Sequence, residues 1–210
     1  LYAKVGKKSK STSSKDGKED KDQGSVTLIG AVSPPGGDFS EPVTQSTLRV
    51  TKTFWALDAK LAQRRHFPSI NWLNSYSLYM DALEPWFAKT VGSDWRGLVE
   101  QMMRILQEED KLMEIVQLVG SDSLPAPQQL TLEVARLIRE FLLQQNAFHE
   151  IDTYCPLEKS KMIMKTILHF SALGNAALEQ GARINDLLEI KSKDKIADAK
   201  FTKDYEKVLK

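Results

Sequence analysis

A histidine and a cysteine lie near each other in the sequence and could form a nucleophilic pair. His149 shortly precedes Cys155, the single cysteine of the chain. A cysteine thiol becomes a nucleophile when a histidine takes its proton and a third group orients that histidine. The sequence offers no orienting group, so a partly buried packing thiol is the favoured interpretation of Cys155. Catalytic pairing with His149 remains the alternative.

Motifs that hold phosphate or metal ions are missing from the sequence. It contains neither G-x-x-x-x-G-K-[ST] nor G-x-G-x-x-G, the patterns whose backbone amides surround phosphate groups. The three histidines, His66, His149 and His169, are far apart, whereas protein metal ligands recur at short, fixed spacings. From the residues alone we predict no catalytic group and no metal site in this chain.

Two phenylalanines occupy loops rather than helix stripes. Phe67 lies in "RRHFPSINW" before a proline, and Phe148 lies in "QQNAFHE" just beyond the expected end of a helix. A loop position suits stacking of the ring on a flat ligand. From the sequence alone, filling of the core is the favoured interpretation of both residues.

A stiff corner follows the first apolar run. The segment "SPPGGDFSEPVT", residues 33–44, combines prolines that fix φ with glycines that permit backbone angles closed to other residues. It therefore predicts a shaped turn, and an ordinary surface turn is the simplest interpretation. Asp38 and Ser40 could cap or close that turn.

Composition excludes several classes of protein. The 210 residues carry a formal net charge of +1, so no basic excess predicts a nucleic-acid partner. One cysteine excludes an internal disulfide framework and fits a reducing compartment. No apolar run approaches the roughly 18 residues that a membrane span needs, so any membrane role is indirect. The first residue is Leu1, from which we expect the chain to be part of a longer one.

The first third of the chain predicts mixed α and β structure. Lys7–Gln23 lacks apolar residues and predicts a mobile loop. Ser25–Val32 and Thr47–Trp55 are β-branched and apolar and predict strands. Asp58 offers an N-cap for a short helix, "AKLAQRR", which must end before the Phe67-Pro68 pair.

The remainder predicts a helical bundle. Apolar residues recur near the 3.6-residue period after Asp94 as far as Gly120, again over Leu130–Leu143, and from Leu157 to Leu178. Two prolines in Ser121–Gln129 separate the first two helices. The tail, 182–210, repeats apolar residues less regularly. The fold class is therefore α+β, with residues 1–73 forming one part and 74–210 a helical domain.

Three long segments resemble a known family. They are "GSVTLIGAVSPPGGDFSEPVTQSTLRV", "FWALDAKLAQRRHFPSINW" and "LQQNAFHEIDTYCP". They closely resemble the C-terminal part of the catalytic A subunit of V/A-type rotary ATPases and ATP synthases, with a weaker likeness to the beta subunit of F-type ATP synthases. The resemblance covers Gly24 to about Phe170. It implies the last strands of a RecA-like nucleotide-binding domain followed by the family's helical domain.

The resemblance also implies roles for particular residues. In the family two aromatic rings enclose the adenine of the nucleotide, and the matching positions are Phe67 and Phe148. By likeness to the beta subunit, the corner faces the rotating stalk, which implies that Asp38, Ser40 and Glu41 are rotor-facing. Ser121–Gln129 takes the place of the beta subunit's acidic helix-turn-helix lever, here rich in proline.

The family's function is implied in the same way. Its A subunits alternate with B subunits in a hexamer around central stalk subunits, and couple ATP synthesis or hydrolysis to rotary transport of H+ or Na+. We expect the complete catalytic chain to bind ATP or ADP with Mg. The expected location is cytoplasmic and peripheral to the membrane, with contact through the ion-translocating sector.

Departures from the family pattern affect the expected activity and nucleotide binding of this chain alone. The family's phosphate loop, catalytic glutamate and Mg-binding segment are absent from the sequence, and its usual "YERAG" stands as "YAKVG" at residues 2–6. We therefore expect this chain alone to be inactive and to bind no nucleotide tightly. The alternative hypothesis is a stand-alone, non-catalytic interaction protein that binds the rotary stalk or assembly factors.

Overall fold

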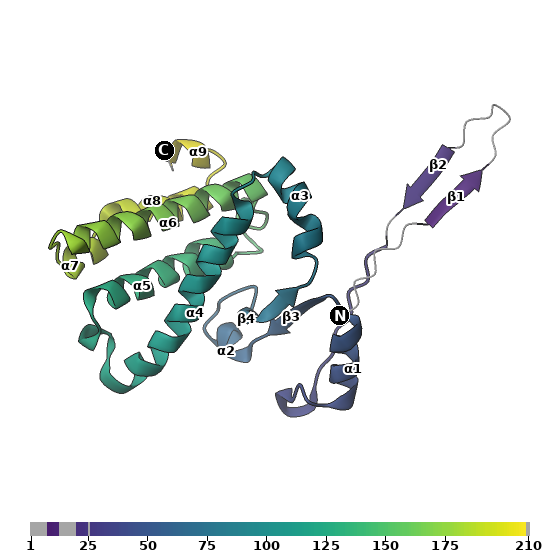
Figure 1. Cartoon of the computed structure of the whole chain (residues 1–210), viewed down its shortest axis with the longest axis horizontal. Coiled ribbons are helices and arrows are strands. Elements are labelled where there is room, and N and C mark those ends of the chain that lie inside the picture. Colours follow the sequence, from purple (N-terminus) through teal and green to yellow (C-terminus); the bar gives the residue numbers. More distant parts are fainter. Residues whose placement is uncertain (1–7, 13–19, 25, 209–210) are drawn as a thin grey trace. The chain divides into compact units, whose positions relative to one another are not determined.

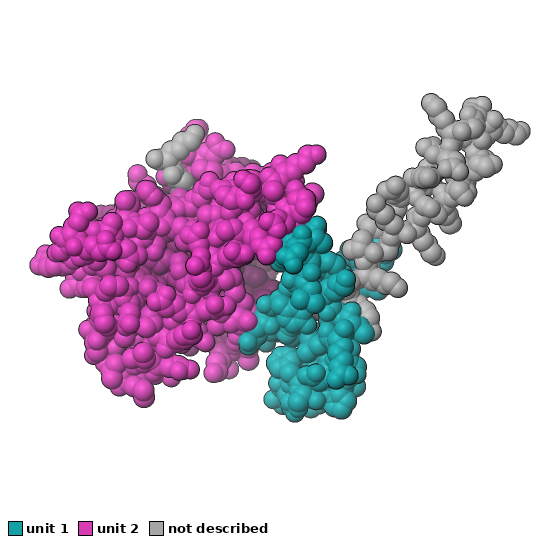
Figure 2. Space-filling model, viewed as in Figure 1, with its two compact units in different colours: residues 1–57, 74–82 teal, residues 58–73, 83–210 magenta. Residues whose placement is uncertain are grey.

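The computed structural model describes residues 8–12, 20–24 and 26–208, most of them helical (Figure 1). The chain forms two compact units, which Figure 2 colours separately. Unit 1 comprises residues 1–57 and 74–82, and unit 2 comprises residues 58–73 and 83–210. Residues 58–73, which the sequence analysis places in the first domain, thus group with the helices.

Unit 1 begins with two short polar strands, β1 (Lys8–Thr12) and β2 (Asp20–Gly24). They pair antiparallel, with Lys8 opposite Gly24 and Thr12 opposite Asp20. Where the sequence predicts a mobile loop over Lys7–Gln23, the structure instead has these paired strands. Their ladder joins backbone groups and so needs no apolar side chains. Residues 7 and 13–19, like the "YAKVG" segment, lie outside the described residues.

The strand predicted at Ser25–Val32 is wrong. Residues 26–32 have extended but irregular backbone, and Ser25 lies outside the described residues. A strand requires a second backbone to accept and donate its hydrogen bonds. The described part of the chain supplies no such partner for this segment.

The corner leads into a helix where a strand was predicted. A 3-10 turn at Pro35–Gly37 is followed by α1 (Pro42–Val50). The Glu41 carboxylate accepts hydrogen bonds from the backbone N–H of Val43 at 3.0 Å and Thr44 at 2.8 Å, and thereby caps α1. Proline at the first helical position suits this start. Of the predicted strand Thr47–Trp55, the N-terminal part is therefore helical.

β3 (Thr53–Leu57) pairs with β4 (Ile70–Ser77) in a two-stranded sheet. β3 and residues 74–77 of β4 belong to unit 1. Within unit 1, Leu78 N–H donates to Lys52 C=O at 2.7 Å, and Ala56 N–H donates to the Ser75 hydroxyl at 3.0 Å. β4 was not predicted, because its asparagine and serine residues interrupt the apolar pattern that marks a strand.

Unit 2 begins with α2 (Ala59–Gln63), the short helix predicted from the sequence. Asp58 caps it, since its Oδ1 accepts from Lys60 N–H at 2.7 Å and from Leu61 N–H at 3.3 Å. The helix ends before the Phe67-Pro68 pair, whose peptide bond is cis. Arg65 there adopts a φ of 58°.

Three long helices follow the predicted order: α4 (Trp95–Val119), α5 (Ala126–Leu137) and α6 (Leu157–Glu179). A further helix, α3 (Met80–Thr90, shared with unit 1), was not predicted from the sequence. A 3-10 turn at Ser121–Ser123 joins α4 to α5, and a π-helical turn, η3 (Ile138–Leu143), continues α5. The tail comprises α7 (Ile184–Leu188), η4 (Lys191–Lys193), α8 (Asp194–Lys200) and α9 (Tyr205–Val208).

Two helix starts differ from the sequence expectation. The second long helix begins at Ala126 rather than near Leu130, because proline is tolerated in the first turn of a helix. Asp94 stands at the N-cap position of α4, but its side chain makes no capping hydrogen bond. Its carboxylate instead pairs with Lys161 and Lys165 of α6, each at 2.6 Å.

The core of unit 2 lies where α4, α5 and α6 pack together, as the side-by-side ribbons in Figure 1 show. Its fully buried side chains include Leu106, Leu130, Ile138 and Ile167. Ile196 of α8 joins the same cluster. The helical spacing read from the sequence therefore marks the buried face along most of these helices, whereas Ile115 and Val119 near the end of α4 stay exposed.

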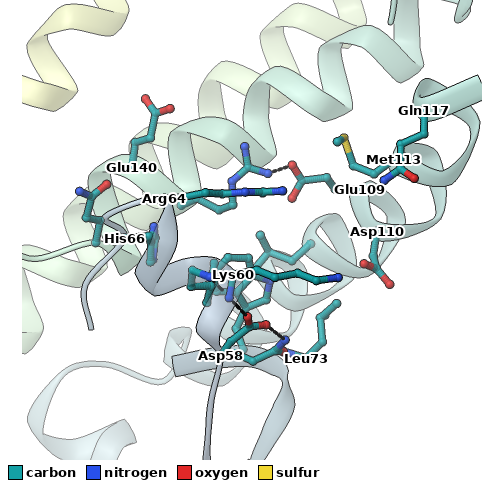
Figure 3. A pocket seen from close by; sticks show the side chains of 16 residues that line it. Asp58, Lys60, Arg64, His66, Leu73, Glu109, Asp110, Met113, Gln117 and Glu140 are labelled. Carbon is teal, nitrogen blue, oxygen red and sulfur yellow. Dashed lines mark hydrogen bonds and ion pairs between the residues drawn. The ribbon is translucent and has the colours of Figure 1, made fainter. Parts of the chain in front are cut away.

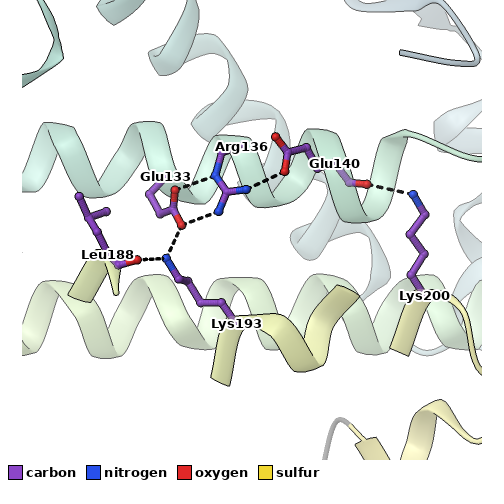
Figure 4. Close-up of polar contacts among 6 residues, drawn as sticks. All are labelled: Glu133, Arg136, Glu140, Leu188, Lys193 and Lys200. Carbon is purple, nitrogen blue, oxygen red and sulfur yellow. Dashed lines mark hydrogen bonds and ion pairs between the residues drawn. The ribbon is translucent and has the colours of Figure 1, made fainter. Parts of the chain in front are cut away.

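A polar network fastens the tail to α5 (Figure 4). Lys193 Nζ lies 2.5 Å from both Glu133 Oε1 and the Leu188 carbonyl oxygen. Arg136 donates two further hydrogen bonds to Glu133, each at 2.8 Å. Burial alone would raise the pKa of Glu133, but hydrogen bonds from Arg136 and Lys193 hold that pKa below its usual value.

Candidate functional site

Phe67 is carried by a loop that folds back on α2. His66 N–H donates to Leu61 C=O at 2.9 Å, which folds the loop back on α2. The His66 ring is buried and lies 5.5 Å from the Trp72 ring, centroid to centroid. Burial, together with the nearby charges of Arg139 and Lys200, lowers the pKa of His66. The Phe67 side chain, by contrast, is 50% exposed.

Phe148 is carried by the irregular segment between η3 and α6, residues 144–156, here called the Phe148 loop. Phe148 N–H donates to Asn146 Oδ1 at 3.0 Å, and His149 N–H donates to Asn146 C=O at 3.1 Å. Asn146 therefore closes a tight turn with Phe148 at its tip. The Phe148 side chain is 100% exposed. Filling of the core of this chain is thus wrong as an account of Phe148.

The structure brings these two loops together, although they are far apart in the sequence. Gln145 N–H donates to the Phe67 carbonyl oxygen at 2.7 Å. The Gln144 side-chain amide donates to the Arg65 carbonyl oxygen at 3.4 Å. The backbone hydrogen bond, at Phe67 itself and three residues before Phe148, joins the two segments. The arrangement leaves both rings available to a flat apolar partner.

A buried carboxylate supports the Phe148 loop from within. Asp152 is 3% exposed, and its Oδ2 accepts from Asn146 N–H at 2.7 Å. Lys200 Nζ, at the end of α8, lies 3.6 Å from the same oxygen. Asn146, Asp152 and Lys200 were not predicted from the sequence to be site residues. The Asn–Asp spacing within the loop is a local signal for a closed turn, whereas nothing in the sequence links Lys200 to it.

A mixed-charge cavity of about 390 Å³ lies within unit 2 (Figure 3). Lys60 and Arg64 face residues of α4 across it, among them Glu109 and Asp110. Arg139 forms an ion pair with the buried Glu109. Neither Phe67 nor Phe148 lines this cavity, but His66 and Gln144, which belong to the loops that carry them, do.

Cys155 is placed for packing rather than for nucleophilic attack. Its Sγ is half-buried and lies 3.2 Å from the Ser160 hydroxyl and 3.7 Å from the Pro156 carbonyl oxygen. His149 Nδ1 accepts from the N–H groups of Ile151 and Asp152, each at 3.2 Å. Because Nδ1 is the acceptor, the neutral ring carries its proton on Nε2, and neither nitrogen offers a free lone pair for a thiol proton.

The corner in unit 1 uses its polar side chains locally. Asp38 Oδ1 accepts from the Ser40 N–H at 2.8 Å and from the Ser40 hydroxyl at 2.7 Å. These hydrogen bonds, the side-chain one first, lower the pKa of Asp38. The Glu41 carboxylate caps the N-terminus of α1. These contacts close the turn, and Asp38 and Ser40 stay exposed on its outer surface.

Among the residues that the structure describes, no three His, Cys, Asp or Glu side chains gather as a metal site requires. Within the same residues, no helix is both long and apolar enough to cross a membrane.

Comparison with protein families assigns both parts of the chain. Residues 3–77 match the nucleotide-binding domain of the ATP synthase alpha/beta family, and residues 84–185 match the C-terminal domain of V and A type ATP synthase. The chain belongs to the V and A type ATP synthase family. The two matched ranges meet between residues 77 and 84, shortly after the predicted boundary. The expected fold class, the end of a nucleotide-binding domain followed by a helical domain, is confirmed.

Curated relatives that the chain matches are named as A subunits of A-type ATP synthases. The chain is 60% identical over 177 residues to the A subunit of the A-type ATP synthase of Methanopyrus kandleri, covering 84% of this chain and 30% of that protein. It is 58% identical over 185 residues to the A subunit from Methanosarcina mazei, covering 88% of this chain and 32% of that protein. The chain therefore spans about a third of the length of these relatives.

A solved structure agrees with the fold. The structure titled "unique ATP synthase subunit NeqB" from Nanoarcheaum equitans superposes with a TM-score of 0.60. The superposition covers 70% of this chain and 36% of the other, at 24% sequence identity. At this identity, the likeness supports the fold and nothing further.

Proposed function

We propose that this chain is the C-terminal part of the catalytic A subunit of an A-type ATP synthase, and that its Phe67 and Phe148 hold the adenine ring of ATP or ADP. The observation that carries the proposal is the hydrogen bond between Gln145 N–H and the Phe67 carbonyl oxygen. It joins two loops that each present an unburied phenylalanine. Relatives named as A subunits of A-type ATP synthases support the assignment.

The chemistry of the two rings fits a purine. An adenine base offers two apolar faces, and stacking on an aromatic side chain is worth about 1 to 3 kcal/mol per base. The chain has no motif that surrounds phosphate with backbone amides. Phosphate and Mg would therefore be bound by residues outside this chain, and we expect this chain alone neither to hydrolyse ATP nor to bind nucleotide tightly.

The same proposal assigns partners. The full subunit would alternate with B subunits around the central stalk and lie peripheral to the membrane, coupling ATP synthesis or hydrolysis to H+ or Na+ transport. The corner that holds Asp38, Ser40 and Glu41 would face the stalk. The carboxylates of Asp38 and Glu41 accept hydrogen bonds from backbone N–H groups of the corner and of α1. Their main role at the stalk would therefore be to keep the corner rigid.

The decisive test is nucleotide affinity in the full-length subunit. Phe67→Ala and Phe148→Ala should each weaken ATP binding by about 1 to 3 kcal/mol, measured by titration calorimetry, because each removes one stacked ring. Leu173→Ala is the matched control, since Leu173 is an exposed apolar residue on α6. It should leave the affinity unchanged.

Two outcomes would contradict the proposal. Unchanged ATP affinity in both phenylalanine variants would remove the rings from the nucleotide site. A native protein of this chain's own size, with no nucleotide binding, would favour the stand-alone interaction protein. Immunoblotting of the source cells reports that size.

A further inference from the structure

The Phe148 loop is held in place by the C-terminal tail. The loop contains no helix or strand, and its tip, Phe148, is fully exposed. Its conformation must therefore come from contacts at its base. The buried Asp152 forms that base, because its carboxylate binds Asn146 N–H at 2.7 Å and so sets the turn that presents Phe148.

Lys200 balances the charge of Asp152. It is the last residue of α8 and is itself buried. Its Nζ lies 3.6 Å from Asp152 Oδ2 and donates to the Glu140 carbonyl oxygen at 3.0 Å, the contact that Figure 4 shows. Lys200 thus bridges the π-helical turn before the loop and the carboxylate at the loop's base. A buried carboxylate left without a cation is strongly unfavourable.

Phe201 supports the loop at a second point. Its ring meets the His149 ring edge to face, at 4.9 Å between centroids. His149 Nδ1 in turn accepts from the N–H groups of Ile151 and Asp152. Two consecutive tail residues therefore contact two different parts of the same loop.

The end of α8 is itself fixed to the bundle. Lys159 of α6, also buried, donates to the Lys200 carbonyl oxygen at 2.6 Å and to the Thr202 carbonyl oxygen at 3.2 Å. Ile196 packs into the core of unit 2. The tail can therefore act as a rigid support rather than follow the loop.

We propose that Lys200 and Phe201 are positioning residues, which hold the segment Asn146–Asp152 in the conformation that presents Phe148 at the tip of its loop, the loop that the Gln145 hydrogen bond joins to Phe67. The consequence for nucleotide binding rests on the proposed function. The structural part of the inference stands on contacts within unit 2 and is tested separately.

The first test is amide hydrogen exchange on this chain. In Lys200→Met the Asn146 amide should exchange about tenfold or more faster, because the carboxylate that accepts its hydrogen bond loses its partner. Phe201→Ala should accelerate the Ile151 and Asp152 amides. Lys195→Met is the matched control, since Lys195 is an exposed lysine of the same helix. It should change none of these rates.

Exchange in the core separates positioning from general destabilisation. Amides of α5, such as those of Val134 and Leu137, should keep their rates in both tail variants. Equal acceleration in α5 and the loop, or an unchanged Asn146 rate in Lys200→Met, would overturn the inference. Phe201 is 44% exposed, so Phe201→Ala should fold. It therefore tests the inference even if Lys200→Met fails to fold.

The second test uses the assembled full-length enzyme. Lys200→Met should raise the KM for ATP severalfold with little change in kcat, because the loop would contact the base rather than the phosphates. Combined with Phe148→Ala it should add little further effect, since both changes act through one ring. Full additivity, or a fall in kcat alone, would contradict positioning. If Phe148→Ala itself has no effect, the proposed adenine contact of Phe148 fails, while the exchange result still decides the role of the tail.

Discussion

Unit 1 and unit 2 differ in how far they bury their large apolar side chains. Unit 2 encloses its long aliphatic residues between α4, α5 and α6, where Leu130 and Ile167 are almost completely buried. Unit 1 leaves large apolar residues exposed, with Ile29 at 72% and Leu57 at 77%. Helical periodicity can be satisfied within a short stretch of chain, whereas strands depend on partners that need not be near in sequence. Unit 2 therefore contains its own hydrophobic core, whereas unit 1 exposes large apolar side chains to solvent.

The largest expected effect is a truncation in the core of unit 2. Leu130→Ala should lower the free energy of unfolding by about 2 to 5 kcal/mol, because it removes buried contacts and leaves a cavity. Ile29→Ala, its counterpart in unit 1, should change that free energy by less than about 0.5 kcal/mol. Urea unfolding followed by circular dichroism measures both. Similar losses in the two variants would show that unit 1 buries Ile29 after all.

The next largest effect is a difference in amide hydrogen exchange between the two units. The amides of α5 lie in hydrogen-bonded helix within the core and should exchange through openings that cost at least about 3 kcal/mol more than those of residues 26–32. The latter make no regular backbone hydrogen bonds in the described part of the chain. Equal protection of the two segments in the monomer would contradict the contrast drawn between the units.

Helix caps offer a smaller, local comparison. Asp58→Ala in unit 2 should cost about 1 kcal/mol, because it removes the acceptor for the Lys60 and Leu61 amides. Glu41→Ala removes the equivalent cap of α1 in unit 1. It should fray α1, seen as faster exchange at Val43 and Thr44, without moving the unfolding transition of unit 2. A shift of that transition would show that the units unfold together.

The same contrast explains what the sequence could and could not predict. Apolar spacing and Gly120 placed α4 correctly, since those signals act within one helix. The strand at Ser25–Val32 was wrong and β4 was missed, because pairing depends on a second segment. Phe67 and Phe148 were identified through the family resemblance, but their connection through Gln145 was not. Lys200 lies too far along the chain from Asp152 for any local pattern to link them.

The smallest expected effect concerns pH and the pairing of Asp94 with α6. Hydrogen bonds from Lys161 and then Lys165 lower the pKa of Asp94 to about 2. A carboxylate whose pKa is lower in the folded state stabilises that state above its unfolded pKa of about 4, and loses this contribution as the pH falls towards 2. Because the Asp94 side chain is 41% exposed, solvent screening limits the contribution to about 1 kcal/mol or less. Asp94→Asn should therefore flatten the loss of stability between pH 4 and pH 2, as measured by thermal unfolding across that range. An undiminished pH dependence in Asp94→Asn would mean that other carboxylates of the chain cause the acid destabilisation, and that the contact between α4 and α6 depends on apolar packing alone.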